Sequence, residues 1–179
     1  MKKIFSVLFV GLLLCAGFNK LNAQGISYDT IKAQLIKDWE RAKAYTGEYL
    51  AAMPADKYTF RAVDTTRSFA EQMLHLAAAN ISLGGNGTGA QRIYTGFNME
   101  KSASAQNKDS VSYYVNTSYD FVINALKNMD AAKLGERQGR ESRWVWMLKA
   151  FEHQTHHRGQ TTIYIRLQGI KPPEERLFK

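Results

Sequence analysis

The chain has 179 residues, the length of one average domain, and carries 24 Lys and Arg against 16 Asp and Glu, a formal charge of +8. An apolar fraction of 45% excludes an intrinsically disordered or collagen-like chain, and a single cysteine cannot form a disulfide framework. Only three prolines, with long stretches rich in Ala, Leu, Lys, Glu and Gln, favour helices over sheet.

The first predicted element is a secretory signal peptide. Lys2 and Lys3 precede an apolar run over residues 4–14, and the polar stretch that follows ends at Ala23 in an approximate cleavage site. The apolar run is too short to span a bilayer, which needs about 20 residues. We therefore expect residues 1–23 to be removed and residues 24–179 to form one exported domain, periplasmic or secreted. Lipidation of Cys15 is a weaker alternative, because Leu14 is not the small residue that normally precedes such a cysteine.

Removal of Lys2, Lys3 and Lys20 would lower the formal charge from +8 to +5 and leave no cysteine. The remaining basic residues are mixed with acidic ones, as in residues 133–143. Mixed charge is typical of a solvated surface and not of a stripe that follows nucleic-acid phosphates. We therefore expect no nucleic-acid partner.

Four helices are predicted from apolar residues at three- and four-residue spacing and from the residues that begin and end them. The second begins with a capping box, Ser68 and Glu71, and is expected to break at Gly84-Gly85. The fourth is followed by Gly169, a residue that suits a left-handed C-terminal cap. The predicted helices cover residues 29–53, 68–83, 108–129 and 142–168.

The sequence contains no alternating apolar and polar run bounded by turns, so we expect no sheet. Four helices of this length predict an all-α protein, a single four-helix bundle. The longest connection, residues 84–107, joins the second and third helices, so these two need not be tight antiparallel neighbours.

Three of the four histidines lie within five residues on the fourth helix. His153 and His157 are four positions apart, so they share one helix face about 6 Å apart, a separation at which two imidazoles can bind one metal ion. His75 on the second helix can supply a third nitrogen if the two helices are adjacent. Three imidazoles would leave coordination positions open, which is typical of catalytic metal sites. His156 points about 100° away from His157 and is expected either on the helix surface or in contact with the ligand side chains from outside.

The same residues also have simpler interpretations that involve no metal ion. A pair of histidines four residues apart is often not a metal site, and His75 can be a hydrogen-bonded core residue. Glu71 is explained by the capping box alone. Arg158 is expected to face outward or to bond loop carbonyls. The glycine-rich run at residues 84–89 lacks the lysine of a phosphate-binding loop, and the zinc-protease order His-Glu-x-x-His is absent.

Two stretches resemble the DinB-like family. One runs from Pro54 to Arg61 and continues from Arg67 to His75. The other is the string His153-Gln154-Thr155-His156-His157-Arg158-Gly159-Gln160, which continues to Pro173. The resemblance covers residues 28–173. It implies an up-down-down-up four-helix bundle that binds a divalent metal, usually nickel or zinc, through His75, His153 and His157.

Some members of that family are thiol-dependent transferases or isomerases, and many have no established activity. We therefore expect a metal-dependent enzyme with a small-molecule substrate, acting either by attack of metal-bound water or by thiol transfer. The alternative is a non-enzymatic periplasmic metal-binding or interaction module. The sequence assigns no catalytic residue. Gln72, Gln160 and Tyr164 are expected to line the pocket, because they lie within two turns of the ligands. Leftover apolar helix faces would suit a homodimer.

Overall fold

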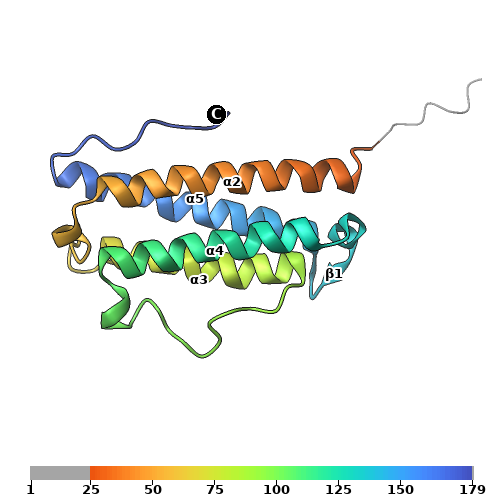
Figure 1. Cartoon of the computed structure of the whole chain (residues 1–179), viewed down its shortest axis with the longest axis horizontal. Helices are drawn as coiled ribbons and strands as arrows, with labels where there is room; N and C mark the ends of the chain where they lie inside the picture. Colours follow the sequence, from red (N-terminus) through yellow and green to blue (C-terminus); the bar gives the residue numbers. More distant parts are fainter. Residues whose placement is uncertain (1–24, 179) are drawn as a thin grey trace, which may run out of the picture.

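A computed structural model describes residues 25–178 of the chain. The predicted signal peptide and Cys15 lie outside these residues. The all-α four-helix bundle is confirmed (Figure 1). Its long helices are α2 (Tyr28–Ala52), α3 (Phe69–Thr88), α4 (Lys108–Asn128) and α5 (Arg143–Leu167). Within the described part of the chain, no helix is long and apolar enough to cross a membrane.

The connections between the long helices contain short elements. Three 3-10 helices are η1 (Ala55–Lys57), η2 (Ala103–Ala105) and η3 (Ala131–Gly135). Strands β1 (Arg137–Gln138) and β2 (Glu141–Ser142) pair antiparallel. Each strand has only two residues, which is too short to show the alternating pattern by which a strand is recognised in a sequence. The sequence therefore does not predict this sheet.

The N-terminus of each long helix is fixed by a polar side chain. Ser27, Asn107 and Ser142 each accept a hydrogen bond from a backbone N–H in the first turn of the helix that follows. The predicted capping box at α3 is confirmed, since Ser68 accepts from the Glu71 backbone N–H and Glu71 accepts from that of Ser68. Because such caps satisfy otherwise unpaired N–H groups, they fix where α3, which carries His75, begins.

Figure 1 shows that α3 and α4 run in one direction and that α2 and α5 run in the other. The start of α3 lies beside the end of α5, where the Tyr164 hydroxyl donates to the Arg67 carbonyl at 2.7 Å. Because α3 and α4 are parallel, the chain must return along the bundle before α4 begins. Residues 89–107 make this return, and they supply one wall of the site described below.

The prediction that α3 breaks at Gly84-Gly85 is wrong. The helix continues to Thr88 and ends at Gly89, whose φ of 79° is the left-handed conformation of a C-terminal cap. A Cβ atom at Gly84 would lie 2.6 Å from Val122 of α4, and one at Gly87 would overlap Met147 of α5. These glycines therefore allow α4 and α5 to pack closely against α3, and the packing outweighs their low helix propensity.

The interior of the bundle contains a buried arginine. Arg158 is only 6% exposed, and its hydrogen bonds go to side chains of the interior, so the prediction that it faces outward or bonds loop carbonyls is wrong. Its Nη1 donates to the Gln154 side chain at 2.9 Å, and its guanidinium lies over the Tyr45 ring at 4.6 Å from the centroid. Gln154 also accepts from the Tyr119 hydroxyl at 2.8 Å. Amide, hydroxyl and aromatic groups of the interior thus bind the guanidinium in place of the water that would hydrate it on the surface.

Candidate metal centre

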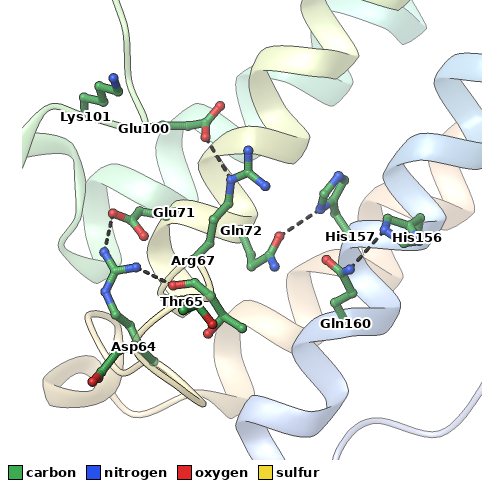
Figure 2. A pocket seen from close by; sticks show the side chains of 12 residues that line it. Asp64, Thr65, Arg67, Glu71, Gln72, Glu100, Lys101, His156, His157 and Gln160 are labelled. Carbon is green, nitrogen blue, oxygen red and sulfur yellow. Dashed lines mark hydrogen bonds and ion pairs between the residues drawn. The ribbon is translucent and has the colours of Figure 1, made fainter.

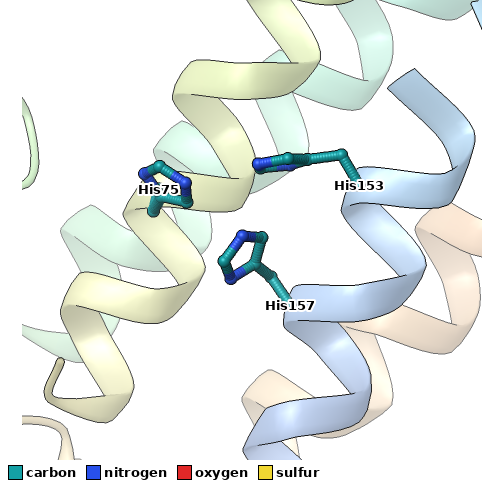
Figure 3. A group of neighbouring side chains, drawn as sticks. All are labelled: His75, His153 and His157. Atoms are coloured by element: carbon teal, nitrogen blue, oxygen red, sulfur yellow. The ribbon is translucent and has the colours of Figure 1, made fainter. Parts of the chain in front are cut away.

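Helices α3 and α5 lie against each other and bring three histidines together. His75 projects from α3, and His153 and His157 project from α5 into the same space (Figure 3). The His75 ring centroid lies 5.1 Å from that of His153 and 4.5 Å from that of His157, and the latter two are 4.4 Å apart. One nitrogen from each ring lies within 4.8 Å of the other two. The predicted convergence of these three side chains is therefore present.

The carboxylate of Glu100 orients the His75 ring. His75 Nδ1 lies 2.6 Å from Glu100 Oε1, and Glu100 Oε2 accepts a hydrogen bond from Arg67 Nε at 3.1 Å. A carboxylate beside Nδ1 favours the tautomer that carries the proton there, so the lone pair of Nε2 is left for another partner. Histidines that bind metals are commonly held in this way.

An amide orients the His157 ring. Gln72 lies one turn before His75 on α3, and its Oε1 is 2.8 Å from His157 Nδ1. Since the amide oxygen can only accept, Nδ1 donates and Nε2 again keeps its lone pair. His153 differs, because its Nδ1 is buried without a hydrogen-bond partner among the described residues. An unpaired buried nitrogen within this cluster is the feature expected where a bound ion would supply the missing partner.

Burial favours the neutral form of two of these histidines. It is the largest cause of the lowered pKa of His157, about 3, and charge repulsion from His153 and His75 contributes to the same shift. Burial also lowers the pKa of His153, with His75 as the next cause. Both imidazoles are therefore neutral near pH 7. Because the neutral ring is the form that binds a metal ion, protons do not compete for these two nitrogens.

His156 lies outside the cluster. It is exposed, as expected for a surface histidine, although its ring centroid is 4.9 Å from that of His157. Its Nε2 is 3.0 Å from Gln160 Nε2. Adjacent positions on a helix point about 100° apart, so His156 cannot direct its ring into the same space.

A polar cavity of about 610 Å³ opens beside the cluster (Figure 2). Gln72 and Gln160 line it, as predicted, together with His157. Tyr164 does not belong to the lining. The Tyr164 side chain is buried, and its hydroxyl donates a hydrogen bond to the backbone carbonyl of Arg67, just before α3 begins. Charged side chains complete the wall, among them Arg61, Arg67, Glu71 and Glu100.

The donor set fits a divalent metal ion. Three imidazoles suit borderline ions such as zinc and nickel, and they leave coordination positions open. Two rings have Nδ1 held by a hydrogen bond, and the third has a buried nitrogen that lacks a partner. Glu100 is not apparent from the sequence, because it lies 25 positions after His75 in a connection without a recognisable pattern. Arg67 lies within the stretch that resembles the DinB-like family, but nothing in the sequence gives it a role.

The comparisons agree with this architecture. A sequence model of the DinB family matches residues 22–177. A DinB-like protein from Bacillus cereus is 17% identical, with a TM-score of 0.67 over 79% of this chain and 95% of its own. One from Bacillus subtilis is also 17% identical, with a TM-score of 0.61 over 81% and 96%. No curated protein matches the sequence. The chain belongs to the DinB family.

Proposed function

We propose that this protein binds a zinc or nickel ion through His75, His153 and His157 and acts as a metal-dependent enzyme on a small molecule. The observation that carries the proposal is the convergence of three imidazoles from two helices, with one nitrogen of each within 4.8 Å of the others. A divalent ion held this way supplies Lewis-acid chemistry at its open coordination positions.

The residues around the histidines have defined tasks in this proposal. Glu100 and Gln72 hold two of the rings in the tautomer that keeps Nε2 free. The cavity next to His157 admits the substrate, and its volume of about 610 Å³ suits a small molecule. Its polar and charged wall favours a hydrophilic compound over an apolar one.

Two reaction classes fit this site: hydrolysis, and transfer involving a low-molecular-weight thiol. The predicted export of the chain favours hydrolysis, because a reduced thiol is less available in an oxidising compartment. No cysteine lies in residues 24–179, so a thiol nucleophile would have to come from a second substrate.

Activity screening tests the proposal. The chain from residue 24 onward, purified without a histidine tag and loaded with Zn²⁺ or Ni²⁺, is assayed against esters, lactams and thiol–electrophile pairs. We expect turnover of one of these classes, lost in His157→Ala and kept in Glu152→Ala, which alters an exposed side chain on the same helix. A protein that retains its metal without any turnover would contradict the enzymatic assignment and support a non-enzymatic metal-binding module.

A further inference from the structure

The cavity beside the histidines contains an arginine with unused donors. Arg67 donates through Nε to Glu100 Oε2 at 3.1 Å, and its Nη1 and Nη2 form no hydrogen bond within residues 25–178. Arg61 in the same wall differs, because its Nη1 donates to the Thr66 carbonyl and its Nη2 donates to Glu71. Figure 2 shows the Arg67 guanidinium beside Glu100, with Gln72 and His157 next along the wall.

Arg67 is held in place at two points. Glu100 binds its Nε, and the Tyr164 hydroxyl binds its backbone carbonyl at 2.7 Å. The next residue, Ser68, is the N-cap of α3. A guanidinium fixed by its Nε side presents its two terminal nitrogens as a fork, which matches the paired oxygens of a carboxylate or phosphate.

The acidic residues next to Arg67 are each paired with an arginine, Glu100 with Arg67 and Glu71 with Arg61. Glu100 uses one oxygen for His75 and the other for Arg67. Glu71 uses one for Arg61 and the other for the Ser68 backbone N–H. All four of these carboxylate oxygens are therefore engaged. The remaining charged side chains of the lining, Asp64 and Lys101, are exposed and of opposite sign.

We propose that Arg67 binds the anionic group of the substrate, a carboxylate or a phosphate, in the cavity beside the metal centre. This inference rests on the proposed function and narrows it to anionic small molecules. The charged side chains of the lining balance, since three are basic and three are acidic: Arg61, Arg67 and Lys101 against Asp64, Glu71 and Glu100. A divalent ion in the histidine cluster would therefore make the site positive. Anions are then attracted to the cavity, and the fork of Arg67 fixes their orientation.

The test is an NMR titration with acetate and with inorganic phosphate, each added to the metal-free and to the Zn²⁺-loaded protein. The Arg67 Nε–H resonance is the reporter, because it shifts when an anion binds the terminal nitrogens of the same guanidinium. We expect Arg67→Gln to weaken binding of the preferred probe about tenfold or more, because a charge-assisted bidentate pair is lost. Arg67→Lys, which keeps the charge without the fork, should fall between Arg67→Gln and the wild type.

Arg61→Gln is the matched control, since it removes a cation of the same cavity whose terminal nitrogens are already paired. It should change probe affinity less than about threefold, as expected for a charge that does not contact the anion. Equal losses in both variants, or no loss in Arg67→Gln, would overturn the proposal. Zn²⁺ affinity is measured separately by chelator competition. Failure of the wild type to bind Zn²⁺ would refute the metal centre, whereas the metal-free titration would still decide the role of Arg67.

Discussion

Replacing His157 with alanine is expected to lower affinity for Zn²⁺ or Ni²⁺ by more than about 100-fold, since loss of a partner that merely orients a ligand already costs about 10–100-fold. His157 is buried and central, with ring centroids 4.5 Å from His75 and 4.4 Å from His153. Its removal leaves two imidazoles, too few to hold a divalent ion tightly. Competition with a chelator of known affinity measures the change.

His156→Ala is the control for this experiment. His156 is the neighbouring histidine in the sequence, it is exposed, and its Nε2 lies beside Gln160 rather than inside the cluster. We expect it to keep metal affinity within about threefold of the wild type, because it removes no ligand. A loss in His156→Ala as large as that in His157→Ala would place the ion elsewhere on α5.

Trp39→Ala is expected to produce the largest loss of stability, about 3–5 kcal/mol in the free energy of unfolding. Trp39 on α2 is completely buried, and its ring packs edge-to-face with those of Tyr119 on α4 and Phe151 on α5, each at 5.7 Å between centroids. Its removal would leave a cavity where three helices meet. Urea denaturation followed by circular dichroism gives the change.

Two further variants show whether this loss comes from the cavity. Leu148→Ala shortens a side chain of α5 that is 44% exposed and should cost less than about 1 kcal/mol. Trp39→Phe keeps most of the ring and removes a buried indole N–H that has no partner among the described residues, so it should cost much less than Trp39→Ala. Similar losses in Trp39→Ala and Leu148→Ala would contradict the described packing.

The sequence predicted the helices well because their signals are local. Apolar spacing, caps and Pro54 placed all four helices near their observed positions. Helix α3 does not break at Gly84-Gly85 as predicted. Helix propensity is a weak preference, and packing against Val122 and Met147 outweighs it. Arg158 was misplaced for a similar reason. Its burial depends on Gln154 and Tyr45, which only the assembled bundle brings beside it.

The site was predictable only in part. The four-residue spacing of His153 and His157 is a property of one helix, so the sequence alone places them on one face. The approach of His75 depends on α3 packing against α5, which local signals do not encode. Glu100 could not be predicted because residues 89–107 have no periodic pattern, and only the return of the chain along the bundle brings Glu100 to His75 and Arg67.

The central claim is that His75 of α3 and the histidine pair of α5 hold one metal ion together. Elemental analysis of tag-free protein, run on the wild type and on His75→Ala, tests it most directly. We expect one divalent ion for each wild-type chain and a large loss in the variant, because His75 is the only ligand that α3 contributes to the cluster. Equal metal content in the two proteins would show that any bound ion does not need His75 and would contradict the claim.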